Sequence, residues 1–168
     1  VVVSYADSDV TGITTADPNA EGWYNTAFDI CPPEGYTIAS TANADTQWGS
    51  QIPVQGEGSV NSVYYLRDVS TGAISRCEDT YKIDKAAPTG LKTEITNEAD
   101  TSLTVTVSAE DAVSGIKNYG LSYVSGGSKA PTITDKGNGV FEVTGLDART
   151  EYTFTASAVD NADNTAQS

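Results

Sequence analysis

Hydrophobic and polar residues alternate along much of this chain with the two-residue period of a β-strand. The clearest example is residues 59–68, where Tyr64 and Leu66 share one face of the predicted strand. A second alternating run, residues 73–83, follows after the turn sequence Ser-Thr-Gly at 70–72. Two such runs joined by a short turn predict a β-hairpin.

Shorter extended runs precede this hairpin, at residues 1–5, 10–15, 27–31 and 36–40. Pro53 stands between Ile52 and Val54. Because proline cannot donate a hydrogen bond to a neighbouring strand, this piece is predicted to be a short edge strand.

The alternation is sharpest after residue 100. Leu103, Val105 and Val107 predict a strand with one buried face, and further strands are predicted at residues 116–123, 140–144 and 152–158. Residues 126–139 are predicted to be a polar connection. No window of the sequence supports a helix of three turns, so the predicted fold class is all-β.

A hinge divides the two sets of strands. Residues 81–90 run from a strand pattern into Pro88 and Gly90, after which a similar pattern begins again. The 168 residues suffice for two small sandwich domains. We therefore predict two tandem β-sandwich domains, residues 1–85 and 86–168.

Composition excludes several classes of function. The chain has no histidine and two cysteines, so most nucleophile–base pairs and zinc sites cannot be built. A hydrolase with paired carboxylates would need a deeper cleft than such small domains offer, and we expect no enzyme. Acids exceed bases in both halves, 12 to 4 up to Lys85 and 11 to 5 after it. Nucleic acid would therefore be repelled, and we expect no such partner.

The ends and the apolar content give two more expectations. No apolar run is long enough to span a membrane, so no membrane insertion is expected. The first residues lack the features of a signal peptide, and the chain contains no methionine. We expect a fragment or a processed product.

The second half resembles a fibronectin type III domain over about residues 85–165. The resemblance rests on the apolar alternation at 103–107 and 116–123 and on the segment from Gly145 to Phe154. The spacing of Leu146 and Tyr152 looks like that family's tyrosine corner, whose hydroxyl bonds back to the backbone. Val107 stands where the family usually has tryptophan, and the family's last strand is expected after Asn164.

The first half resembles immunoglobulin-like repeats of Gram-positive bacterial surface proteins. The resemblance rests on residues 22–26, 33–38, 63–74 and the ending Lys-Ile-Asp-Lys-Ala-Ala-Pro-Thr at 82–89. It implies a secreted or wall-attached multidomain protein, often an adhesin or a glycan-degrading enzyme. The partners it implies are neighbouring domains of the same chain, because such repeats serve as spacers.

Two cysteines in an extracellular sandwich suggest a disulfide, here between Cys31 and Cys77. The alternative is a pair of buried free thiols.

Acidic residues form a second candidate site. Asp84, Glu110, Asp111, Asp160 and Asp163 are predicted near the junction, and Asp84, Asp111 and Asp160 are the candidate ligands for Ca²⁺. No other cofactor is expected. The alternative is that these carboxylates are solvated or cap turns through their side chains.

Aromatic residues form the third candidate site. Trp23, Trp48 and Tyr65 are candidates for stacking on a sugar ring, and Tyr24 and Tyr64 stand next to two of them. The alternative is that Trp48 and one member of each pair fill the core. Isopeptide bonds from lysines such as Lys82 or Lys92 are not specified by any motif.

The sequence therefore predicts a non-catalytic spacer. The alternative is an adhesion or carbohydrate-binding module that recognises a host glycan or a host surface protein.

Overall fold

The computed structural model describes residues 9–168, so the predicted strand at residues 1–5 lies outside the described part. The described residues form strands, turns and loops and no helix, and the fold is all-β. Accordingly, they contain no helix that could cross a membrane. The chain divides into two compact units, Val1–Lys85 and Ala86–Ser168, at the boundary that the hinge predicted.

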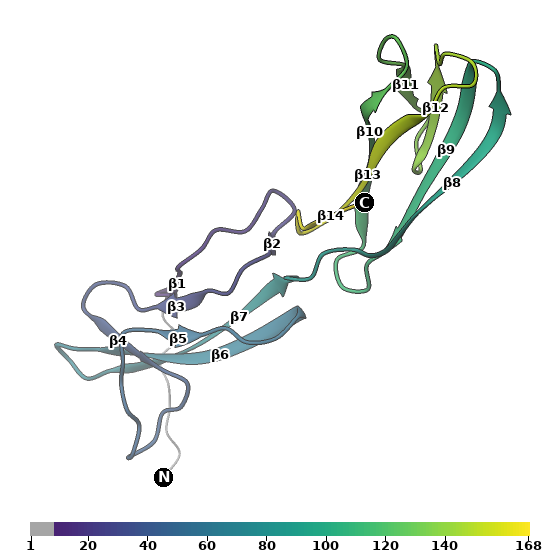
Figure 1. Ribbon diagram of the computed structural model, residues 1–168. Coiled ribbons are helices and arrows are strands. Elements are labelled where there is room, and N and C mark those ends of the chain that lie inside the picture. The colour runs from purple at the N-terminus through teal and green to yellow at the C-terminus, as the bar shows by residue number, and fades with distance from the viewer. Residues whose placement is uncertain (1–8) are drawn as a thin grey trace. The chain divides into compact units, whose positions relative to one another are not determined.

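The first unit has seven described strands in two sheets (Figure 1). One sheet has the order β1-β3-β5 and the other the order β2-β7-β6-β4. Strand β5 is an edge strand, as Pro53 predicted. The strands are β1 (Ile13–Thr14), β2 (Trp23–Tyr24), β3 (Asp29–Cys31), β4 (Tyr36–Ala39), β5 (Ile52–Pro53), β6 (Gly58–Asp68) and β7 (Ile74–Ile83).

Side chains from both sheets meet in one core in the first unit, which makes it a β-sandwich. Ile30 comes from the small sheet, and Ile38, Tyr64 and Leu66 come from the large one. All four are at most 1% exposed. Burying a side chain of this size stabilises a protein by roughly 1.5–3 kcal/mol, so these positions carry much of the stability of the unit.

The Tyr64 hydroxyl is held inside this core by two hydrogen bonds. It donates to Oδ2 of Asp79 at 2.5 Å and accepts from the backbone N–H of Gly12 at 2.8 Å. Burial and the bond to Asp79 raise the pKa of Tyr64, so the hydroxyl stays protonated. The bond to Gly12 ties the segment before β1 to the central strand β6.

The second unit also has seven strands, labelled in Figure 1. Its sheets have the orders β11-β12-β9-β8 and β10-β13-β14. The fourth strand of the unit pairs with the fifth, and the third with the sixth, as in the constant-type immunoglobulin sandwich. The strands are β8 (Thr89–Ala99), β9 (Ser102–Glu110), β10 (Ile116–Gly126), β11 (Thr132–Asp135), β12 (Val140–Thr144), β13 (Tyr152–Asp160) and β14 (Thr165–Gln167).

The core of the second unit again joins both sheets. Val105, Val107 and Val143 come from one sheet and Ala156 from the other, and each is at most 4% exposed. Both units are therefore immunoglobulin-like β-sandwiches.

A tyrosine closes one end of the second sandwich. The Tyr152 hydroxyl accepts a hydrogen bond from the backbone N–H of Asp147 at 2.8 Å, next to the buried Leu146. This is the geometry of a tyrosine corner, which holds the segment before β13 against the start of that strand.

Two strands of the second unit had no counterpart in the sequence pattern. Strand β8 is exposed along almost its whole length, and β11 occupies part of the predicted polar connection at residues 126–139. Both are held mainly by backbone pairing, β8 with β9 and β11 with β12. Hydrophobic alternation therefore does not reveal them.

Replacing Gly12 by alanine should destabilise the first unit. A β-carbon at this position would overlap the Ile30 side chain and crowd the Tyr64 hydroxyl. Overpacking of this kind lowers the free energy of unfolding by about 1–3 kcal/mol. Urea unfolding followed by tryptophan fluorescence can measure this loss. Gly49→Ala is the matched control, because its nearest atoms would lie 3.9 Å away. Equal stability of the two variants would contradict the close packing at Gly12.

Candidate metal and aromatic sites

The turn that follows β9 is organised around one carboxylate oxygen. Oδ1 of Asp111 accepts hydrogen bonds from the backbone N–H groups of Val113, Ser114 and Gly115 at 2.7–3.2 Å. An aspartate that accepts from the amides that follow it is a standard way to close a turn. Asp111 therefore has a structural role in this loop.

The loop after β13 is built in the same way. Oδ1 of Asp160 accepts from the backbone N–H groups of Ala162 and Asn164 at 2.8 and 2.9 Å, and Oδ2 accepts from the Asn164 side chain at 2.9 Å. The Asp160 side chain is fully buried. These three donors offset the cost of removing the carboxylate from water.

The two loops are joined within the second unit. Nδ2 of Asn161 donates to the backbone carbonyls of Ser114 and Gly115 at 2.8 and 3.1 Å. The carboxylate oxygens of Asp111 and Asp160 lie within 4.8 Å of each other. Two oxygen ligands of this kind suit Ca²⁺, which takes six to eight oxygens and draws the remainder from carbonyls and water.

The other acids predicted at this site are placed differently. Asp163 forms an ion pair with Nζ of Lys117 at 2.8 Å, and the Glu110 side chain is exposed. Asp84 belongs to the first unit, where it is buried and its backbone N–H donates to the carbonyl of Tyr24 at 2.9 Å. Within the second unit, the structure therefore brings together Asp111 and Asp160.

The predicted disulfide between Cys31 and Cys77 is not formed, and both thiols are free. The physical reason is the alternation along β3. Ile30 points into the core and is fully buried, so its neighbour Cys31 points to the opposite side of the strand. Cys77 is buried in the core, where its Sγ donates to the Val10 carbonyl at 3.5 Å.

Trp48 and Tyr65 lie on the outer face of the sheet β2-β7-β6-β4, together with two arginines. The Arg67 guanidinium lies over the Trp48 ring, 5.9 Å from its centroid. Tyr65 is two residues before Arg67 on the same face of β6 and is paired with Arg76 of β7. Glu78, at 2.8 Å, and Tyr65 raise the pKa of Arg76. We call Trp48, Arg67, Tyr65 and Arg76 the arginine–aromatic patch.

Trp23 lies elsewhere on the same face. It is part of β2, at the opposite edge of the sheet from β4, and its ring is 5.8 Å from Nζ of Lys82. Trp23 pairs with Lys82, whereas Tyr65 pairs with Arg76, six residues earlier on β7, or about 20 Å along that strand. The three predicted sugar-binding aromatics therefore do not form one platform.

No pattern in the sequence indicated the two arginines of this patch. In each aromatic pair, one member is in the core: Tyr24 is 7% exposed and Tyr64 is fully buried. Trp23 and Tyr65 are half-buried on the outer face. Trp48 is also half-buried. It therefore does not fill the core, contrary to the alternative prediction.

No family model and no curated protein matches the chain. Among solved structures, the chain is similar to the human desmocollin-1 ectodomain, with 13% sequence identity and a TM-score of 0.32. The match covers 97% of this chain and 36% of that chain, so this chain spans about a third of its length. The immunoglobulin-like fold is therefore assigned from the strand pairing described above.

The free thiols lead to a direct test. Without reductant, the denatured protein should react with an alkylating reagent at both Cys31 and Cys77. In the folded protein, Cys77 should react more slowly, because it is buried and because burial raises the pKa of its thiol. Intact mass and peptide mapping distinguish the two sites. If neither thiol in the denatured, unreduced protein could be alkylated, the two cysteines would be bonded after all.

Proposed function

We propose that the chain is a non-catalytic structural module of a secreted or cell-wall-attached bacterial surface protein. Its role is to space or present other domains of the same polypeptide. The bacterial, extracellular setting rests on the resemblance of the first half to Gram-positive surface repeats, and on the fibronectin type III resemblance of the second half.

One observation carries this proposal: the polar side chains best placed for chemistry hold loops in position. Asp111 and Asp160 accept hydrogen bonds from loop amides, Asn161 joins their two loops, and the Tyr152 hydroxyl closes the corner before β13. A spacer needs such rigid ends and well-packed cores, and no residue in it has to react.

The acidic composition agrees with this role. The chain carries a net charge of −14 and has a pI of about 4.1. Like charges spread over both units favour solubility and keep copies of the chain apart. Nucleic acid is an unfavourable partner for the same reason.

A second candidate function is recognition of an acidic glycan or glycoprotein. It is favoured by the arginine–aromatic patch, which holds two of the four basic residues up to Lys85. Aromatic rings stack on sugar faces, and guanidinium groups bind carboxylates or sulfates with paired hydrogen bonds.

A binding screen distinguishes the two functions. The protein is applied to arrays of glycans and host glycoproteins, with calcium and again with chelator. A spacer should give no saturable binding in either condition. A recognition module should bind acidic glycans and lose binding in Trp48→Ala and Arg67→Ala, whereas Lys82→Ala, at the other edge of the sheet, should have little effect. Binding with that pattern would replace the spacer proposal.

We further propose that Asp111 and Asp160 bind Ca²⁺. Their carboxylate oxygens lie within 4.8 Å of each other, and Asn161 joins the two loops that carry them. A bound ion would make these loops more rigid, as a spacer requires.

Calcium at 5 mM should stabilise the protein against heat. If the site has the affinity of extracellular calcium modules, the free energy of unfolding rises by about 1–2 kcal/mol, and the Tm rises by several degrees. Asp111→Asn should remove the shift, since the amide oxygen can still accept the loop hydrogen bonds while the negative charge is lost. Glu94→Gln on the exposed strand β8 is the control and should keep the shift. An unchanged wild-type Tm, or a shift that Asp111→Asn retains, would exclude this site.

A further inference from the structure

Strands β10 and β11 are edge strands of the two sheets of the second unit. Among the described residues, β10 pairs with β13 and β11 pairs with β12, and no strand joins the two edges. Strand β14 lies at the other edge of the sheet that contains β10. The side of the sandwich that β10 and β11 border is therefore open between its sheets.

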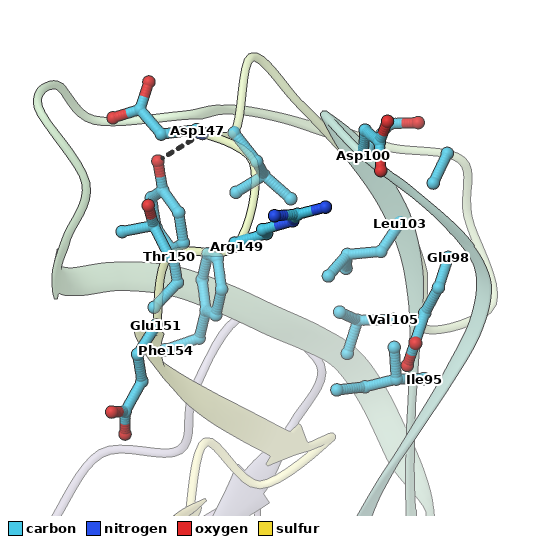
Figure 2. Close-up of a pocket in the computed structure, with 14 residues that line it drawn as sticks. Ile95, Glu98, Asp100, Leu103, Val105, Asp147, Arg149, Thr150, Glu151 and Phe154 are labelled. Atoms are coloured by element: carbon cyan, nitrogen blue, oxygen red, sulfur yellow. Dashed lines mark hydrogen bonds between the residues drawn. The ribbon is translucent and has the colours of Figure 1, made fainter.

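A polar hollow lies on this side, between the start of β10 and the turn that joins β11 to β12. Its volume of about 460 Å³ is within the range of small-ligand sites. A larger hollow of the same unit, shown in Figure 2, has an apolar wall that includes Leu103, Val105 and Phe154. The two hollows share no residue, so the polar one is a separate site.

Tyr119 supplies an aromatic wall to the polar hollow. Its hydroxyl donates to the Ala109 carbonyl at 3.3 Å, which holds the ring in place. Gly139 is buried beside the ring. A β-carbon at this position would lie 3.0 Å from Cδ2 of Tyr119 and would overlap the Val107 carbonyl oxygen. The glycine therefore leaves space beside the ring that any other residue would fill.

Three polar side chains that line the hollow keep hydrogen-bonding capacity. Oδ1 of Asp135 accepts from the backbone N–H of Gly137 at 2.7 Å, and Oδ2 has no partner among the described residues. Within the same described part of the chain, the side-chain amides of Asn118 and Asn138 have no partner either. Each amide can both donate and accept hydrogen bonds.

Strand β10 has a β-bulge where it borders the hollow. Lys117 is the extra residue, between the paired residues Ile116 and Asn118. Bulges are common beside functional sites because they redirect side chains. Nζ of Lys117 forms an ion pair with Asp163 at 2.8 Å, so its positive charge is already balanced.

We propose that this hollow binds a single neutral sugar ring. Sugar hydroxyls both donate and accept hydrogen bonds, as the amides of Asn118 and Asn138 do, and one hydroxyl can donate to Oδ2 of Asp135. The C–H face of the sugar packs against the Tyr119 ring. Asp135 and the net charge of −14 disfavour an anionic ligand.

The expected affinity is low, because the hollow is open and the ligand is small. A ligand of about a dozen non-hydrogen atoms should bind such a site with a dissociation constant in roughly the millimolar range. Binding of this strength is too weak to be retained in a glycan-array screen. The site therefore goes beyond the spacer proposal and needs a measurement that detects weak binding.

The test titrates three neutral sugars into ¹⁵N-labelled protein up to 100 mM: methyl β-glucoside, methyl β-galactoside and methyl α-mannoside. At least one should give saturable shifts of the amide signals of Asn118, Tyr119, Asn138 and Gly139. Methyl β-glucuronide carries a negative charge that Asp135 repels. It should bind at least threefold more weakly than the best neutral sugar.

Protein variants test the polar side chains of the hollow. Asp135→Asn keeps an acceptor for the Gly137 N–H but replaces the open oxygen by a donor, so binding should weaken at least threefold. Asn118→Ala should have the same effect. Thr150→Ala, at the larger hollow in Figure 2, is the matched control and should leave binding unchanged. An unchanged ¹⁵N spectrum outside β10–β12 shows that a variant is folded.

The proposal is overturned if none of the three neutral sugars gives saturable shifts, or if the shifts lie away from the hollow. Binding by both Asp135→Asn and Asn118→Ala as strong as that of the wild type would overturn it as well. Tighter binding of the glucuronide would overturn the assignment to neutral sugars. None of these outcomes depends on the spacer proposal.

Discussion

Each unit depends on the burial of one face of its central strands between two sheets. In the first unit, Tyr64 and Leu66 of β6 meet Ile30 from the opposite sheet, and in the second, Val105 and Val107 of β9 meet Ala156 of β13. Because side chains alternate along a strand, fixing these inward residues also fixes which residues face outward. The outer positions of Tyr65 and Cys31 follow from this one constraint, and so does the absence of a disulfide.

Sequence alternation predicted those parts of the fold in which one strand face is buried. The β6–β7 hairpin, β9 and the inward face of β13 were found in this way. The boundary near Lys85 was predicted from Pro88 and Gly90 instead. Strand β8 was missed because almost all of its side chains are exposed, and backbone pairing with β9 holds it in the sheet. The disulfide was predicted because two cysteines lie on predicted strands of an extracellular sandwich. Ile30 points into the core, however, so its neighbour Cys31 points away from the buried Cys77.

The candidate sites were predictable only in part, for a related reason. The loop acids Asp111 and Asp160 could be placed together, because the loops after β9 and β13 lie at the same end of such a sandwich. The arginine–aromatic patch could not be placed, because it depends on the register of β4, β6 and β7 and on the loop that carries Trp48. Register is set by pairing between distant strands, and no local pattern in the sequence reports it.

The pairing of the two longest strands in the first unit determines which surface is left for partners. Strand β7 pairs along almost all of β6, so the surface that remains is the outer face of a completed sheet. Because the backbone groups inside such a sheet are already paired, its face can select partners only through side chains. In the first unit these are the aromatic rings and guanidinium groups of the arginine–aromatic patch. Any recognition by this unit therefore depends on the register that places Tyr65 beside Arg76, and a slip of one residue would turn both side chains to the core face.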